Sequence, residues 1–190
     1  MAKNPRRRAE LLDAALRVLA GQGARGLTFR AVDAEAGVPA GTASNYFAGR
    51  DDLLNQAGAH IYVRLTPDPE QAAEALSGAP TKEHLAELMR WIVGRMAENR
   101  TVYLALLELR LEATRRPELR ATLTERIRED LEANAAGHAG SGMPGGRTEV
   151  VLLYLAVNGL VAEVLTLPGV LDGERDPDEL IGLMVDRLVP

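Results

Sequence analysis

Three histidines and one serine are the side chains of this sequence that metal binding or covalent catalysis would use first. His60, His84 and His138 lie far apart in the sequence, and none has a Glu three residues before it, as carboxylate-bridged metal sites in helical bundles need. Ser141 lies between two glycines but lacks the G-x-S-x-G motif of a nucleophile elbow. We therefore expect no metal, no cofactor and no enzymatic activity.

The absence of cysteine narrows the chemistry further. A chain without Cys has no disulfide framework, no thiolate metal site and no cysteine nucleophile, and this composition suits a reducing cytoplasm. The basic start of the chain is followed by Glu10 and Asp13 rather than by the apolar segment of a signal peptide. Asn158 and Glu163 interrupt the most apolar run, residues 150–167, so we expect no membrane span.

A glycine-rich segment at residues 21–26 (GQGARG) matches the G-x-G-x-x-G pattern of dinucleotide-binding proteins. That fingerprint requires a strand before it and a βαβ unit around it. A helical pattern precedes the segment here, so we interpret these glycines as a turn between two helices.

The charge is divided unevenly along the 190 residues. The net charge is −5, but residues 1–50 contain eight Lys or Arg against four Asp or Glu and carry +4, so the remaining 140 residues carry −9. A basic end on an acidic body concentrates the attraction for a polyanion such as DNA at one place. Chance asymmetry is the alternative. Arg6, Arg7 and Arg8 could form either a flexible arm that reaches DNA or a solvated tail.

Apolar residues recur every three or four positions almost throughout, and no segment alternates with period two, so we predict an all-α fold. A first helix should cover about residues 6–20 and end at the glycines that follow. Thr28 can cap a second, short helix, and Gly37 can adopt the left-handed conformation that closes it.

A third short helix is predicted for residues 39–47, because Pro39 suits the first turn of a helix. A fourth should begin after Gly49 and stop before Pro67. Phe29 and Phe47 continue the apolar stripes of their helices, so we place both in the core. The later pattern predicts helices at about residues 81–99, 100–113, from 117 onward, 148–167 and 176–188, with a flexible glycine-rich loop at 137–147.

Two short helices joined through Ala36, Gly37 and Val38 and followed by an aromatic pair have the layout of a helix-turn-helix. Residues 27–47 (LTFRAVDAEAGVPAGTASNYF) and 50–54 (RDDLL) resemble the N-terminal signature of the TetR/AcrR family of transcriptional regulators. The rest of the chain is similar to that family only in length, helical pattern and its closing pair of apolar helices. The resemblance implies an N-terminal three-helix bundle that binds DNA, residues 1–52, and a C-terminal helical domain for ligand binding and dimerisation, residues 53–190.

The resemblance also implies which residues contact DNA. Thr28 and Tyr46 would donate hydroxyl hydrogen bonds to phosphates, and Arg50 stands where the family usually has a lysine that neutralises a phosphate. Asn45 could bond an adenine edge and Thr42 could meet a thymine methyl. The implied set is Thr28, Arg30, Ala40, Gly41, Thr42, Ser44, Asn45, Tyr46 and Arg50.

Four positions depart from the common pattern of the family. Ala40 replaces a frequent lysine, Ala43 a frequent leucine and Ser44 a frequent tyrosine. Pro39 replaces a frequent serine cap. We therefore expect lighter base readout than is usual, and the operator sequence cannot be transferred.

A ligand pocket is expected between the helices that follow residue 53, since small-molecule sites favour such apolar gaps with a few polar anchors. Candidate lining residues are His60, Tyr62, Met89, Trp91, Met96, Tyr103 and Asn158, each of which could instead be an ordinary packing residue. Met89, Val93 and Met96 share one helix face, which would suit a mainly apolar ligand of adaptable shape.

The sequence thus predicts a homodimeric repressor that binds a near-palindromic double-stranded DNA operator and is released by a small-molecule inducer. The last two apolar helices of each chain would form a four-helix dimer interface. Two other hypotheses stay open, namely a helical small-molecule binding protein with a vestigial helix-turn-helix and an α-helical enzyme.

Overall fold

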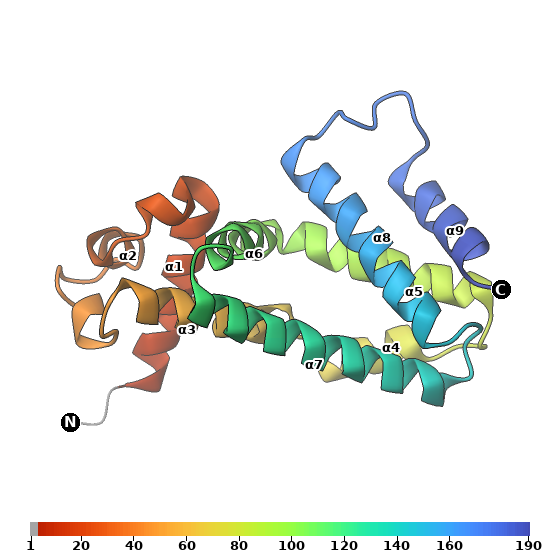
Figure 1. Cartoon of the computed structure of the whole chain (residues 1–190), viewed down its shortest axis with the longest axis horizontal. Coiled ribbons are helices and arrows are strands. Elements are labelled where there is room, and N and C mark those ends of the chain that lie inside the picture. Colours follow the sequence, from red (N-terminus) through yellow and green to blue (C-terminus); the bar gives the residue numbers. More distant parts are fainter. Residues whose placement is uncertain (1–3) are drawn as a thin grey trace. The chain divides into compact units, whose positions relative to one another are not determined.

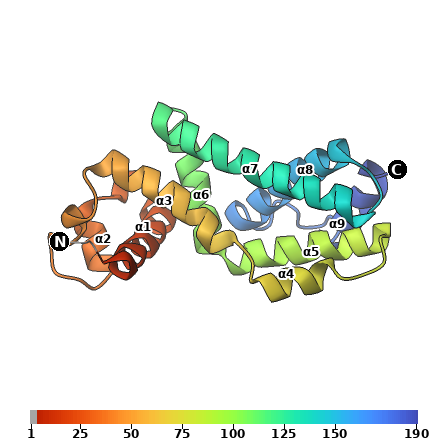
Figure 2. The same ribbon diagram turned by 90° about the horizontal axis from the view of Figure 1, so that it is seen from below.

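The described part of the chain, residues 4–190 of a computed structural model, is helical (Figures 1 and 2). No strand occurs within these residues, which confirms the all-α prediction. Lys3, one of the basic residues counted in the N-terminal charge, lies outside the described residues. The elements are α1 (Pro5–Gly26), α2 (Phe29–Glu35), the 3-10 turn η1 (Ala43–Asn45), α3 (Arg50–Leu65), α4 (Pro69–Leu76), α5 (Lys82–Glu98), α6 (Arg100–Ala113), α7 (Pro117–Ser141), α8 (Arg147–Thr166) and α9 (Pro177–Leu188).

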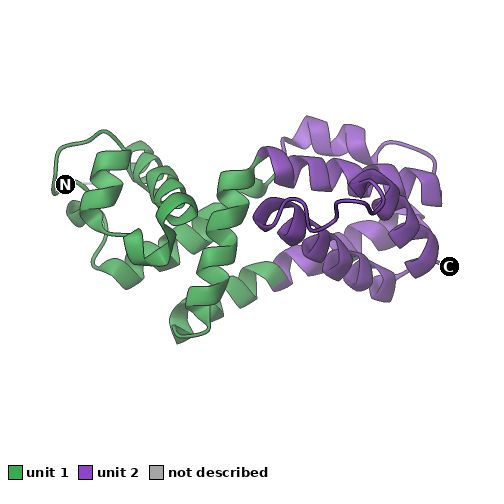
Figure 3. Cartoon of the chain, turned by 90° about the horizontal axis from the view of Figure 1, so that it is seen from above, with its two compact units in different colours: residues 1–66, 99–127 green, residues 67–98, 128–190 purple. Residues whose placement is uncertain are grey.

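The helices divide into two compact units (Figure 3). Unit 1 comprises the residues up to Thr66 together with Asn99–Ile127, and unit 2 comprises Pro67–Glu98 together with Arg128–Pro190. α7 therefore contributes its first part to unit 1 and the remainder to unit 2. The predicted division after residue 52 concerns function rather than packing, and it stays a prediction.

α1 is the helix around which unit 1 is packed, since it contacts α2, α3 and α6. Its apolar stripe includes Leu11, Leu16 and Leu19, which are at most 1% exposed. Fully burying such a side chain stabilises a fold by about 1.5–3 kcal/mol. The helix begins where the Asn4 side chain accepts hydrogen bonds from the first backbone N–H groups, and it is interrupted at Gly23, whose φ of 67° and ψ of 178° are not helical.

The basic residues at the start of the chain are helical, in agreement with a first helix from about residue 6, so of the two alternatives left open for Arg6, Arg7 and Arg8 a flexible arm does not form. Arg6 and Arg7 lie in the first turn of α1, and their guanidinium groups form ion pairs with Glu10 at 3.2 and 2.9 Å. Arg8 donates a hydrogen bond to the side chain of Gln56 on α3. The Asn4 cap and these side-chain contacts hold the basic residues in the helical conformation.

Unit 2 contains α4, α5, the second part of α7, α8 and α9, with α5 packed against both α8 and α9. Leu85, Leu153 and Val185 form the centre of its core and are at most 3% exposed. The Lys82 ammonium group donates to the carbonyl of Val189 at 2.7 Å. Polar contacts therefore supplement the apolar packing of α5 against the last helix.

Two boundaries in unit 2 differ from the prediction. α4 was not predicted, although Asp68 caps it by accepting from Glu70 N at 2.9 Å and Pro69 occupies its first position, both of which are sequence signals for a helix start. The loop predicted for residues 137–147 is wrong in its first part, because α7 continues through Ser141. The start of α9 is confirmed, with Asp176 accepting from Asp178 N at 2.9 Å and a proline in the first turn.

α8 is long and apolar enough to cross a membrane, judged by length and composition alone. Core helices of water-exposed proteins can pass the same test. Within the chain, 28% of the apolar stretch of α8 is buried. One flank of this helix therefore packs inside unit 2 while apolar side chains remain on another.

Two neighbouring glycines of α1 give a matched test of the interruption at Gly23. Gly21 is helical with open space where a Cβ would stand, so Gly21→Ala should stabilise the protein by about 0.5–1 kcal/mol. Gly23→Ala should destabilise it by about 1–3 kcal/mol, because its backbone conformation is nearly exclusive to glycine. Urea unfolding followed by circular dichroism measures both, and stabilisation by both substitutions would show that α1 is uninterrupted.

Candidate nucleic-acid interface

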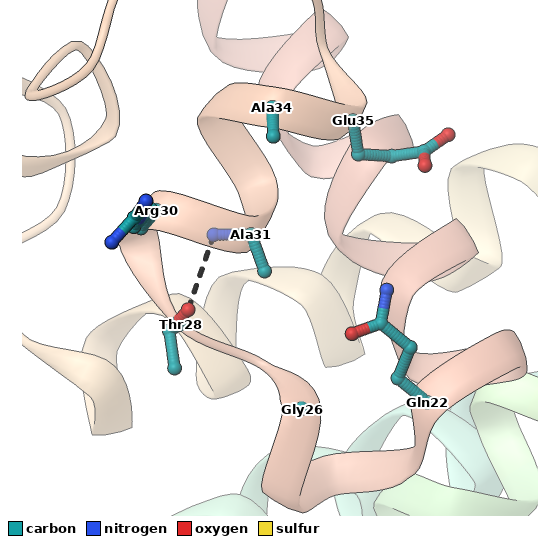
Figure 4. Close-up of a pocket in the computed structure, with 7 residues that line it drawn as sticks. All are labelled: Gln22, Gly26, Thr28, Arg30, Ala31, Ala34 and Glu35. Carbon is teal, nitrogen blue, oxygen red and sulfur yellow. Dashed lines mark hydrogen bonds between the residues drawn. The ribbon is translucent and has the colours of Figure 1, made fainter.

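Thr28 and Arg30 form one side of the predicted DNA-binding face. Thr28 caps α2 as predicted, since its hydroxyl oxygen accepts a hydrogen bond from the Ala31 N–H at 3.1 Å. Both residues are exposed and line an open hollow of about 530 Å³ beside α2 (Figure 4). Its other lining residues are Gln22, Gly26, Ala31, Ala34 and Glu35. The Thr28 hydroxyl hydrogen and the Arg30 guanidinium are donors of the kind that phosphate oxygens accept.

The turn after α2 has the predicted form. Gly37 has a φ of 65°, in the left-handed region, and the N–H of Val38 donates to the carbonyl of Asp33 at 3.0 Å. The chain then reverses into the segment that the helix-turn-helix layout assigns to base recognition. α2 and η1 are in contact, so the two parts of the motif do pack together.

The helix predicted for residues 39–47 is wrong. The segment contains a turn followed by the single 3-10 turn η1, because Gly41 has a φ of 89° and cannot continue a right-handed helix. The N–H groups of Gly41 and Ala43 donate instead to the two carboxylate oxygens of Asp33, each at 2.7 Å. We call this stretch, residues 39–47, the reading segment.

The polar side chains of the reading segment bond to its own backbone. The Ser44 hydroxyl and the Asn45 side-chain amide both donate to the carbonyl of Gly41, at 2.8 and 3.1 Å. The Thr42 hydroxyl donates to the carbonyl of Pro39 at 2.5 Å. Ser44 and Asn45 are exposed, as are Ala40 and Gly41, while Thr42 is half-buried. The predicted base-contacting positions thus lie together on one short exposed stretch whose donors are held by local hydrogen bonds.

The aromatic pair separates into one core residue and one half-exposed residue. Phe47 is 2% exposed and belongs to the core of unit 1, and Phe29 packs against the same core, as predicted. Tyr46 is half-buried. The guanidinium carbon of Arg8 lies 6.0 Å from the centre of the Tyr46 ring and 5.7 Å from that of Phe47, within the range of a cation–π contact. The start of α1 therefore supports the end of the reading segment.

Arg50 begins α3 and reaches back to the turn between α1 and α2. Its Nε donates to the carbonyl of Leu27 at 3.3 Å, and a terminal nitrogen donates to the carbonyl of Ala24. The N–H of Ala24 in turn donates to the Glu108 carboxylate on α6 at 3.1 Å. The phosphate contact expected of Arg50 stays a prediction. In the protein alone, the guanidinium group binds the backbone carbonyls of this turn.

A second charged link connects the start of α3 to the junction of α6 and α7. Arg116 forms ion pairs with Asp51 and with Glu112, the latter at 2.9 Å. Hydrogen bonds from Arg115 and Arg116 lower the pKa of the Glu112 carboxyl. Arg116, which directly precedes α7, thus links the start of α3 to the last turn of α6.

Two family models match the chain. The model for bacterial regulatory proteins of the tetR family matches residues 11–57, and the model for a tetracyclin repressor-like C-terminal domain matches residues 80–190. The second match alone spans more than half of the chain. The chain belongs to the TetR family. The family assignment confirms the predicted all-α transcriptional regulator with an N-terminal DNA-binding helix-turn-helix, a family whose members are generally not enzymes.

Solved structures of TetR-family and related proteins resemble this chain over nearly its whole length. A TetR-family member from Streptomyces coelicolor A3 is 30% identical, covers 98% of this chain and 99% of its own, and has a TM-score of 0.69. The multidrug binding protein EbrR, complexed with ethidium, has the same identity, coverage and TM-score. FadR from Bacillus subtilis, in complex with stearoyl-CoA, is 20% identical with a TM-score of 0.70 over 96% of this chain and 97% of its own, and shares the fold. No curated protein sequence matches the chain.

The predicted ligand residues of this TetR-family chain are divided between the two units. His60 and Tyr62 on α3 and Tyr103 on α6 belong to unit 1. His60 makes a 2.8 Å contact with Asp13 on α1, and Tyr103 is 1% exposed. His60 therefore has a partner inside unit 1, and its ligand role stays a prediction.

Met89, Trp91, Met96 and Asn158 belong to unit 2. The guanidinium carbon of Arg95 lies 5.1 Å from the centre of the Trp91 ring, and Met89 packs against the core of the unit. The Asn158 side-chain amide donates to the carbonyl of Tyr154 at 2.8 Å. Within residues 4–190, no group of three or more His, Asp or Glu is arranged to hold a metal ion.

Asp33 is the site residue that sequence reasoning missed. It was counted only as a negative charge, whereas its carboxylate holds the reading segment. Two sequence signals could have indicated this role. An acid directly follows the buried Val32 in a short amphipathic helix, and a proline stands where a capping side chain is expected.

Proposed function

We propose that this protein is a ligand-responsive, cytoplasmic transcriptional repressor that binds a near-palindromic operator as a homodimer and releases it when a small, mainly apolar inducer binds. The observation that carries DNA binding is the reading segment, a short exposed stretch packed against α2, whose positions Ser44 and Asn45 present polar side chains. Repression, rather than activation, is the usual direction of response in this family.

DNA recognition is proposed to combine positioning and reading. Thr28 and Arg30, on the exposed hollow beside α2, would contact phosphates and fix the motif on the duplex without distinguishing bases. Tyr46 and Arg50 are proposed to add two further phosphate contacts. Asn45 would read one base edge in the major groove, supported by Ser44 and Thr42.

Two substitutions separate these roles. Tyr46→Phe should weaken binding to every duplex by about fivefold, because it removes one hydrogen bond worth about 1 kcal/mol. Asn45→Ala should instead lose about 1–3 kcal/mol of discrimination at one base pair. Fluorescence anisotropy with the DNA upstream of the protein's own gene, at moderate salt with competitor DNA, measures both.

Uniform weakening by Asn45→Ala would contradict its assignment to base reading. If the unaltered protein showed no preference for that DNA over competitor, the operator assignment would fail. A helical small-molecule binding protein with vestigial DNA binding would then be the better description.

The exposed apolar face of α8 and α9 supports the proposed homodimer. Leu155 on α8 is 59% exposed, and Leu152 and Leu183 on the same pair of helices are 38% and 37% exposed. Exposed leucines on two helices that contact each other are unfavourable in water, and an identical face on a second copy would cover them through an isologous interface. A dimer would also bring two reading segments to one palindromic operator.

Leu155 and Leu111 form a matched pair for testing the interface, since both are 59% exposed. Leu155→Glu should convert the dimer to monomers, because it would bury a carboxylate against an apolar partner face. Leu111→Glu, on α6, should leave the dimer intact. Sedimentation equilibrium at micromolar protein distinguishes the two states, and a dimer unaffected by Leu155→Glu would place the interface elsewhere.

The proposed response to ligand needs a connection from the ligand site to the DNA-binding face. Within unit 1, Glu108 of α6 holds the N–H of Ala24, and Arg50 of α3 holds the carbonyl of the same residue. A displacement of α6 would therefore act on the turn from which α2 begins. The ligand changes DNA affinity only if it binds two arrangements of these helices with different free energies.

Trp91 is the only tryptophan in the chain and gives a direct signal for ligand binding. EbrR has also been crystallised with proflavin, which we take as the probe. Proflavin added without DNA should quench Trp91 fluorescence saturably if the ligand site lies beside α5. Quenching that never saturates and equals that of free N-acetyltryptophanamide would place no ligand site near Trp91.

A further inference from the structure

Asp33 is the charged side chain that unit 1 buries most completely. It is 2% exposed, and among the described residues it is the one polar or charged residue in the buried class. Burying a carboxylate is costly unless hydrogen bonds replace its lost water. The two short bonds from Gly41 N and Ala43 N supply that replacement, and both donors come from the reading segment.

The reading segment has no cap of its own. Backbone N–H groups at the start of a helical turn need acceptors, which a preceding Ser, Thr, Asp or Asn usually supplies. Pro39 has no side-chain acceptor. Thr42, directly before η1, makes no capping bond, and its hydroxyl donates to the carbonyl of Pro39. The acceptor therefore comes from α2, eight and ten residues earlier in the chain.

The same bonds fix the side chains that face outward. Gly41 is held at its N–H by Asp33, while its carbonyl accepts from both Ser44 and Asn45. Gly41 makes these three bonds with a left-handed φ of 89°, a conformation that favours glycine. One carboxylate thus determines the backbone of residue 41, and residue 41 determines where two polar side chains lie.

We propose that Asp33 is a positioning residue for DNA recognition, which sets the conformation of the reading segment and thereby the placement of Ser44 and Asn45 on the bases. The proposal rests on the DNA-binding function proposed above. Because Asp33 is buried, it would not itself contact DNA. Its effect on sequence preference passes through Gly41 and Ala43, so it should alter the choice of sequence more than general attraction to DNA.

Asp33→Asn tests the proposal with little change in shape. An amide offers one oxygen as acceptor and turns an NH₂ group toward the second backbone N–H, so one of the two bonds is lost. We expect the ratio of operator affinity to competitor affinity to fall at least tenfold, with competitor affinity within twofold of the unaltered protein. Hydrogen exchange at the Gly41 and Ala43 amides, measured by NMR, should accelerate at least tenfold.

Glu125→Gln is the matched control, because it removes the same charge from the same unit at a position outside the proposed DNA-binding face. Glu125 is exposed and lies on α7, in the part of that helix that belongs to unit 1. This variant should keep both the affinity ratio and the exchange rates. An equal fall in the ratio for Glu125→Gln, or an unchanged ratio and exchange for Asp33→Asn, would overturn the proposal.

The unaltered protein provides a second measurement in case Asp33→Asn does not fold. Its Gly41 and Ala43 amides should exchange as slowly as those inside α2, and exchange as fast as in an open loop would overturn the proposal. This measurement needs no DNA. Protected amides in a protein that selects no DNA sequence would refute the proposed function while leaving the local role of Asp33 intact.

Discussion

The burial of one face of α1 is the constraint on which the arrangement of unit 1 depends. Leu11, Leu16 and Leu19 lie on that face, and α2, α3 and α6 all contact this helix. α2 is only seven residues long, too short to be stable in isolation. The position of α2, and that of the reading segment beside it, therefore follows from how α2 packs against the longer helix α1.

Hydrogen bonds then refine what apolar packing leaves undetermined. The turn after Gly23 offers one N–H and two carbonyls to side chains from α6 and α3, namely Glu108 and Arg50. Such groups would otherwise be unsatisfied at a helix interruption. The same turn therefore connects α1 to α2 and is hydrogen-bonded to α3 and α6. A shift of either of those helices would displace the start of α2.

Much of this fold could be predicted from caps and periodicity. Thr28, Gly37, Asp176 and the glycine interruption of α1 have the local signals that the chain uses. The reading segment could not be predicted in this way, because its shape depends on a side chain from another helix. Pro39 predicts the start of a helix. A turn forms instead, because Gly41 has a left-handed φ and the N–H groups of Gly41 and Ala43 donate to Asp33.

The candidate ligand residues show a different limit of prediction from sequence. Periodicity placed Met89 and Met96 on a helix, but it could not assign His60 a partner on α1 or set Arg95 against Trp91. Such contacts depend on which helices are neighbours, and periodicity within one helix carries no information about neighbours. Residues that look like ligand anchors in sequence can be satisfied by the protein itself.

The carbonyl of Gly41 has a consequence for how such a protein would move along a genome. Ser44 and Asn45 both donate to it in the protein alone. On a duplex whose base edges offer these donors no acceptor, both can keep their hydrogen bonds to the Gly41 carbonyl. Binding to such a sequence therefore leaves neither donor unsatisfied. An unsuitable sequence would then cost the lost base contact without adding the cost of an unsatisfied donor, so sliding along non-specific DNA would meet no extra barrier from these two side chains.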